Sequence, residues 1–184
     1  GVGLVGSEMC IRDSLCTGIY TWNAEFVNCR FSEIPYVYPV KIRGIKSRVE
    51  NCHFTNMDWW ANPGGGAAEL GNIARYVTFE NSKVGGLGGS HLMEYCRIED
   101  FKDPCDCSGI NRGAHGAPRS MTRYNWIING PGANGIRIDG GANGAGNRRG
   151  DIHHIITIGN NRGMRLKGDF HDVHHITCLL YTSD

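Results

Sequence analysis

Short segments in which apolar and polar residues alternate run along most of the chain, and one of them recurs. It has the form apolar-x-Asn-apolar-x-apolar and occurs at residues 26–31 and 49–54. Looser copies lie at residues 79–84 around Asn81, 93–98 around Tyr95, 123–128 around Asn125, 152–157 around His154 and 173–177 around His175. Alternation places apolar side chains on one face of a strand, and Asn tolerates a left-handed backbone better than most residues. The motif therefore predicts two short strands joined at a bend.

A second segment has the form apolar-x-apolar-x-Gly and lies between copies of the first. It occurs at residues 40–44, 136–140 and 164–168, with weaker copies at 67–71 and 109–113. Gly44 and Gly71 are 27 positions apart, and Gly113, Gly140 and Gly168 follow one another at 27 and 28 positions. Glycine suits the end of such a strand because it adopts the positive φ of a tight turn. A strand that returns at a fixed period predicts a solenoid of stacked coils, here a parallel β-helix.

An antiparallel β-sandwich is the alternative architecture, since it also uses many short strands. It does not explain why a Gly-ended strand returns at a regular interval. The β-helix has one weak point, because Asn81 and Tyr95 are only 14 positions apart, too few for a full coil. The sequence pattern does not determine the register of the coils in this part of the chain.

Composition narrows the classes of function. The formal net charge of +1 argues against a nucleic-acid partner, which requires a clearly basic surface. No run of about 18 apolar residues is present, so no membrane span is expected. The 27 glycines are about twice the usual share and indicate many turns. Three cysteines lie in apolar strand patterns as small core residues, and the spacing of the cysteines does not indicate a disulfide framework.

The two ends are expected to be foreign to the protein. Residues 4–13 and 178–184 match translations of a sequencing-adapter sequence in its two orientations. We therefore assign residues 1–14 and 178–184 to adapter sequence and residues 15–177 to the coils of a longer β-helix.

Residues 125–129 (NWIIN), 135–140 (GIRIDG) and 152–155 (IHHI) resemble the pectate-lyase-like right-handed parallel β-helix superfamily. The resemblance extends over residues 20–177. It implies an all-β solenoid, an extracellular or periplasmic location and a polysaccharide partner. The superfamily includes lyases, hydrolases, epimerases and phage tailspikes, so the fold alone does not select an activity.

Stacking would bring the outward side chains of the Gly-ended strands together in one charged column. Its expected members are Lys41, Arg43, Glu69, Asn111, Arg137, Asp139, Arg165 and Lys167, with Asp169 just beyond. Arg137 and Arg165 should lie one coil apart, as should Asp139 and Lys167. Such a column is either a solvated surface with weak ion pairs or a functional site.

The resemblance places lyase active sites on such a face. A lyase removes the proton next to a uronate carboxylate, and a cation crowded by other cations gives up its proton more easily. On this hypothesis Lys167 or Arg165 is the base and Arg137 binds the carboxylate. Asp139, with Asp169 or Glu69, would bind Ca²⁺, the one cofactor expected, or act as general acid.

Hydrolysis is the other possible reaction, and it needs two carboxylates roughly 5 to 9 Å apart, for which Asp139 and Asp169 are the candidates. His115 is a candidate general acid or base in the loop after a charged strand. Substrate contacts are expected from two adjacent aromatic residues and three cations, namely Trp59, Trp60, Lys41, Arg43 and Arg112.

Two histidine pairs recur 21 positions apart, His153-His154 and His174-His175. They are either a ladder at a bend or a transition-metal site. The leading hypothesis from the whole sequence is an enzyme that cleaves a polysaccharide, by β-elimination or by hydrolysis. The alternative is a non-catalytic β-helix, such as a carbohydrate-binding module, an adhesin or a tailspike-like protein.

Overall fold

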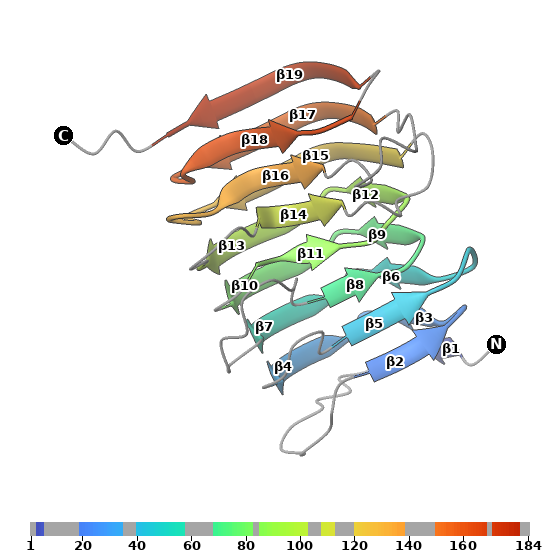
Figure 1. The fold of residues 1–184 in the computed structure, drawn as a ribbon. Helices are drawn as coiled ribbons and strands as arrows, with labels where there is room; N and C mark the ends of the chain where they lie inside the picture. Colours follow the sequence, from blue (N-terminus) through green and yellow to red (C-terminus); the bar gives the residue numbers. More distant parts are fainter. Residues whose placement is uncertain are drawn as a thin grey trace.

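The computed structural model describes residues 3–5, 19–34, 40–57, 68–82, 85–102, 108–112, 120–138, 150–168 and 171–180. In these segments all regular structure is β-strand, and every strand pair is parallel. The chain winds as a right-handed coil from β1 at one end to β19 at the other (Figure 1). The predicted parallel β-helix is confirmed, and the antiparallel sandwich is wrong. No helix in the described segments could cross a membrane.

One wall of the solenoid is a seven-stranded sheet that contains the Gly-ended strands. From the N-terminal end it contains β2 (Ile19–Trp22), β5 (Val40–Arg43), β8 (Ala68–Leu70), β11 (Leu87–Gly88), β14 (Ser108–Arg112), β16 (Asn134–Ile138) and β18 (Arg162–Leu166). Strand β11 is a copy that the sequence pattern did not reveal, because its outward position is Gly88.

The remaining walls belong to a 12-stranded sheet with two wings. One wing contains β1 (Gly3–Val5), β3 (Glu25–Val27), β6 (Arg48–Glu50), β9 (Ile73–Arg75) and β12 (Leu92–Glu94). The other contains β4 (Arg30–Ile34), β7 (His53–Met57), β10 (Thr78–Ser82) and β13 (Arg97–Phe101). The long strand β15 (Ser120–Ile128) pairs with both wings and is followed by β17 (Gly150–Ile158) and β19 (Asp172–Leu179).

A ladder of left-handed residues forms the corner between the wings, and we call it the corner ladder. Its members all have φ between 50 and 57°: Asn28, Asn51, Tyr76, Tyr95, Tyr124, His154 and His175. The tyrosine rings stack with centroids 5.1 and 5.0 Å apart. Successive members are 23, 25, 19, 29, 30 and 21 positions apart, so the corner keeps its alignment while the coils differ in length.

The structure corrects two positions of the first motif. Asn81 does not belong to the corner ladder but to a second left-handed bend, which it shares with Asn56, Asp100 and Asn129. The interval from Asn81 to Tyr95 is therefore not a coil. Asn125 is fully buried, and the neighbouring Tyr124 turns the corner in its place.

The core is a set of stacked apolar columns between the sheets. Phe31 and Phe54 stack face to face with centroids 4.5 Å apart, and Phe79 continues this column. Cys29, Cys52 and Cys96 are buried free thiols, as expected for core cysteines. Each large apolar side chain buried in this way stabilises the fold by about 1.5–3 kcal/mol.

Glycine also lines the inside of the seven-stranded sheet, where Gly86, Gly109, Gly135 and Gly163 allow adjacent coils to approach closely. A Cβ on Gly135 would lie 2.5 Å from the carbonyl oxygen of Gly163 and 2.8 Å from Cγ2 of Thr157. A Cβ on Gly86 would collide with the carbonyl oxygen of Gly109. We call these residues the glycine column.

The expected adapter segments include β1 and the last residues of β19, which pair as strands with their neighbours. Their assignment to adapter sequence stays a prediction.

Candidate functional site

The outer face of the seven-stranded sheet carries the charged column that the sequence predicted. Register partners along it are Tyr20, Lys41, Glu69, Gly88, Asn111, Arg137 and Arg165. Arg137 on β16 lies directly beside Arg165 on β18, as expected for residues one coil apart. The alternation of strand residues produces this column, since inward neighbours such as Ile42, Leu70, Ile110 and Ile136 belong to the core.

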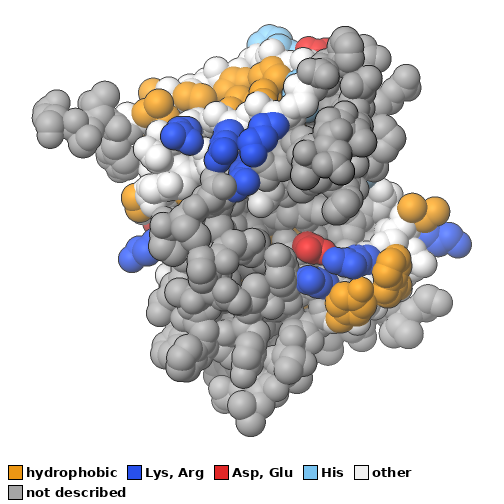
Figure 2. Space-filling view, viewed as in Figure 1, with side chains coloured by type: hydrophobic (Ala, Val, Ile, Leu, Met, Phe, Trp, Pro, Cys, Tyr) orange, Lys and Arg blue, Asp and Glu red, His pale blue; other side chains and the backbone are white. Residues whose placement is uncertain are grey.

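A cationic group occupies the C-terminal part of this face. It consists of Arg137, Arg165 and Lys167, and the backbone N–H of Lys167 continues the strand pairing by donating to the carbonyl of Ile138 at 2.9 Å. Figure 2 shows basic side chains gathered over β16 and β18. The described residues of β14, β16 and β18 include no carboxylate.

A second group of side chains occupies the N-terminal part of the face, and it contains an ion pair and exposed aromatic residues. Arg43 donates from Nε and Nη2 to Oε2 of Glu69 at 3.3 and 3.2 Å. Its guanidinium also reaches the hydroxyl of Tyr20 at 3.3 Å. The hydrogen bond to Glu69, followed by the charge of that carboxylate, raises the pKa of Arg43. The ion pair therefore partly neutralises Arg43.

Exposed aromatic side chains complete this second group. Tyr20 and Trp22 are 60% and 61% exposed and are the register partners of Lys41 and Arg43. Sequence reasoning missed both residues because their strand ends at Asn23 instead of a glycine. The alternation in residues 19–22 is the signal that could have identified them.

The expected role of Glu69 as a Ca²⁺ ligand beside Asp139 or Asp169 stays a prediction, because both aspartates lie outside the described residues. Oε2 of Glu69 accepts two hydrogen bonds from Arg43. No cluster of three potential ligands in the described segments includes it. The register places Lys41 on one side of Glu69 and Gly88 on the other, and neither supplies a second carboxylate.

The expectation that Arg112 contacts substrate is wrong for a direct contact, because its side chain points inward and is 4% exposed. Arg112 is the register partner of the core residue Ile138. Its guanidinium donates to the carbonyl of Met121 at 2.8 Å, to Oγ1 of Thr122 at 2.6 Å and to the carbonyl of Ser90. Burial lowers its pKa to about 9, so it stays charged at neutral pH. Through these hydrogen bonds Arg112 links neighbouring coils of the solenoid.

Five predicted site residues lie outside the described segments, namely Trp59, Trp60, His115, Asp139 and Asp169. Asp139 directly follows β16, and Asp169 follows the end of the described segment after β18. The roles of all five residues stay predictions.

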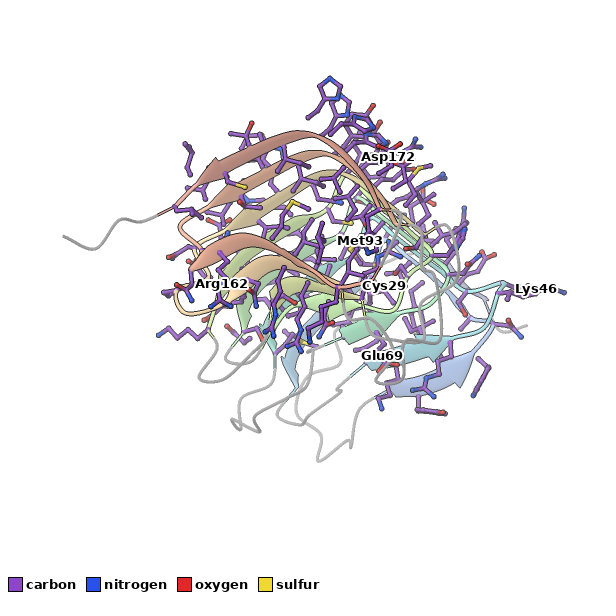
Figure 3. The ribbon with its side chains drawn as sticks, turned by 45° about the horizontal axis from the view of Figure 1, so that its top comes forward. Cys29, Lys46, Glu69, Met93, Arg162 and Asp172 are labelled. Carbon is purple, nitrogen blue, oxygen red and sulfur yellow. The ribbon has the colours of Figure 1, made fainter. Side chains whose placement is uncertain are left out.

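The two histidine pairs lie on the 12-stranded sheet. His153 stacks on His174 with centroids 4.9 Å apart, and His154 stacks on His175 at 4.6 Å. In Figure 3, Asp172 marks the start of β19 near the top, whereas Glu69 lies low on the seven-stranded sheet. The histidine pairs are therefore separate from the charged face.

Comparisons with protein-family models, with curated proteins and with solved structures found no match to this chain.

Proposed function

We propose that this chain is part of a β-helix enzyme that binds an acidic polysaccharide along the outer face of the seven-stranded sheet and cleaves it by β-elimination. The observation that carries the proposal is the direct register pair of Arg137 and Arg165, with Lys167 next to it. These cations are grouped on strands that are free of carboxylates in their described residues.

The spacing of the face suits a linear polyanion. Strands in a sheet are about 4.8 Å apart, so the side chains of one column recur at that interval along the solenoid axis. A chain of uronate sugars lying along the axis would meet Arg137 and Arg165 in succession. A guanidinium binds a carboxylate with two parallel hydrogen bonds, which fixes the orientation of the sugar.

Neighbouring side chains would hold the rest of the polymer. Tyr20 and Trp22 present exposed rings with both apolar and polar parts, which suits packing against the apolar face of a sugar. Lys41 lies next to Tyr20 in the same column. We assign this group to binding and the cationic group to chemistry.

In the proposed reaction Arg137 binds the carboxylate of the reacting sugar and stabilises the negative charge that develops beside it. Lys167 or Arg165, after releasing its own proton to solvent, accepts in its neutral form the proton from the carbon next to that carboxylate. The electron pair of the broken C–H bond forms a carbon–carbon double bond, and the glycosidic C–O bond breaks. The leaving oxygen takes up a proton. Asp139 is the proposed acid, because it follows β16 directly.

Hydrolysis would need two carboxylates on either side of the bond. The candidates for this role, Asp139 and Asp169, lie outside the described residues, and Arg43 holds the described carboxylate of Glu69. The grouped cations Arg137, Arg165 and Lys167 are the observation that supports elimination.

The test uses the full chain with polygalacturonate and with alginate. Elimination gives an unsaturated uronate that absorbs in the ultraviolet, whereas hydrolysis gives new reducing ends without that absorbance. Arg137→Gln and Lys167→Gln should each lower the rate at least about 100-fold, the scale of one general base or one charge-stabilising donor. Arg30→Gln, an exposed cation on the other sheet, is the control and should leave the rate unchanged.

A non-catalytic carbohydrate-binding module is the second candidate, and the exposed Tyr20 and Trp22 favour it. Saturable, salt-sensitive binding without any cleavage would select this function. If the chain neither binds nor cleaves acidic glycans, both proposals are wrong.

A further inference from the structure

Four histidines converge on the solvent side of β17 and β19, and we call them the histidine cluster: His153, His154, His174 and His175. The backbone arranges them, because His154 and His175 are members of the corner ladder and each has φ of 53°. His153 and His174 precede them and are register partners. In each pair, the first histidine lies in the strand and the second lies at the corner. The rings of one pair stack on those of the other.

The ring nitrogens within each pair face one another. Nδ1 of His174 lies 2.7 Å from Nδ1 of His175, and the same distance separates Nδ1 of His153 from Nδ1 of His154. Two nitrogens this close cannot both carry a proton, so at least one presents a lone pair. A metal ion would accept both lone pairs and leave both protons on Nε2. Two imidazole nitrogens bound at 2.0–2.1 Å in a tetrahedral site are about 3.3 Å apart, so the paired rings would exchange their 2.7 Å contact for the ion by separating by about 0.6 Å.

A third ligand is within reach of one such pair. His154, His174 and His175 each offer a ring nitrogen, and these nitrogens all lie within 4.8 Å of one another. All three side chains are exposed, so water could complete the coordination of an ion. The described tyrosines of the corner ladder stack in the same way but offer no imidazole nitrogen.

Asp151 provides an independent indication of a cation at this place. Its Oδ1 is buried and has no hydrogen-bond partner. The same atom lies 3.9 Å from Nε2 of His153 and 4.0 Å from Nε2 of His174. These separations are longer than a hydrogen bond, so Asp151 acts on the two rings through its charge, which favours a bound cation at this place.

The surrounding charges also suit a cation. Asp172 is the register partner of Asp151 and adds a second carboxylate at this edge. The nearest described cation in the column is Arg123, the register partner of His153. Arg123 donates to Glu94 at 2.6 Å, which offsets its charge.

We propose that His154, His174 and His175 bind a divalent transition-metal ion of the Zn²⁺ type, with Asp151 as a positioning residue. Three imidazoles with one position open to water are typical of such ions. This site is separate from the proposed polysaccharide face and does not depend on it.

The test is titration of the full chain with ZnCl₂, followed by calorimetry and by equilibrium dialysis. One Zn²⁺ per chain should bind. His154→Asn and His175→Asn should each weaken binding at least about 10-fold, and Asp151→Asn should weaken it about 10-fold, as loss of an outer-shell partner does. Asparagine is the matched replacement, since Asn28 and Asn51 occupy the same corner with the same backbone conformation.

Two controls separate a site from general effects. His53→Gln removes a histidine on β7, which pairs with Glu80, and should leave Zn²⁺ binding unchanged. Tyr76→Asn alters the corner ladder without touching a histidine, and binding should also persist, with circular dichroism confirming the fold of each variant. The proposal is overturned if Zn²⁺ does not saturate the chain, or if the double variant His154→Asn/His175→Asn folds and binds as tightly as the parent.

Discussion

The side-chain oxygen of Asn125 accepts a hydrogen bond from the backbone N–H of Cys96, one coil away, at 2.8 Å. The side-chain nitrogen of Asn125 donates to the carbonyl of Met93 at 3.1 Å. In the next coil, Ile155 is the register partner of Asn125 and has no polar side-chain atom. Asn125 thus satisfies two backbone groups in the core where the corner of β12 and β13 meets the unbroken strand β15.

Asn125→Ala should lower the free energy of unfolding by about 2 kcal/mol, because two buried backbone groups lose their partners. Urea unfolding followed by circular dichroism measures the change. Asn161→Ala, at an exposed position before β18, is the control and should change the midpoint little. Equal midpoints for the two variants would contradict the role of Asn125.

Arg112→Lys should destabilise the solenoid by about 2–4 kcal/mol, because one ammonium group cannot replace a guanidinium that donates to two backbone carbonyls and a threonine hydroxyl. The control is Arg97→Lys, which alters an exposed ion pair with Glu99 and should cost less than about 1 kcal/mol. Thermal unfolding of both variants checks the difference. If Arg112→Lys unfolds like the parent, the buried network does not stabilise the fold.

Gly135→Ala should prevent normal pairing of β16 with β18, because the added Cβ would lie 2.5 Å from the backbone oxygen of Gly163 and a backbone atom cannot move aside cheaply. We expect a loss of at least about 2 kcal/mol. Thr78→Ala, an outward position of β10, is the control and should have a small effect. Hydrogen exchange of the β16 and β18 amides gives a local measurement, and unchanged protection there would refute the close approach.

Tyr95→Val should destabilise the corner ladder more than Tyr95→Asn. Both changes remove ring stacking with Tyr76 and Tyr124, worth about 0.5–1.5 kcal/mol per pair. Only valine adds strain, since a β-branched residue is disfavoured at the φ of 56° found there. Urea unfolding of the two variants should therefore separate them, and the opposite order would argue against a strained corner.

Burial raises the pKa of the Cys52 and Cys96 thiols to about 12. Both should resist iodoacetamide at pH 8 in the folded chain, whereas the exposed Cys178 should react, as peptide mapping would show. Their folded pKa exceeds the ordinary value of 9.0, so they stay protonated in the fold while the unfolded chain ionises. Stability should consequently fall as the pH rises above about 9, and Cys96→Ala should reduce that fall.

The sequence predicts the seven-stranded sheet well because glycine turns and strict alternation both mark its strands. Arg137 and Arg165 were placed correctly from this pattern alone. Arg112 was placed incorrectly, because a basic residue was assumed to face solvent. The same alternation places it inward, since it follows the outward Asn111. Its burial depends on carbonyl groups supplied by distant coils, which no local pattern reveals.

The corner was harder to predict than the strands. Asparagine is the expected residue for a left-handed backbone, and it led to Asn81 and Asn125, whereas the chain uses Tyr76 and Tyr124. Ring stacking between coils offsets the local cost of this conformation for tyrosine. That gain depends on which residues become neighbours after folding. The convergence of the histidine nitrogens depends on the same alignment.

The corner ladder stays aligned across intervals that range from 19 to 30 positions. Insertions and deletions between strands are thus absorbed outside the paired segments and do not propagate along the axis. In evolution, such a scaffold can change the segments between its strands while every strand keeps its partner. New specificity can then arise by loop replacement, without redesign of the core.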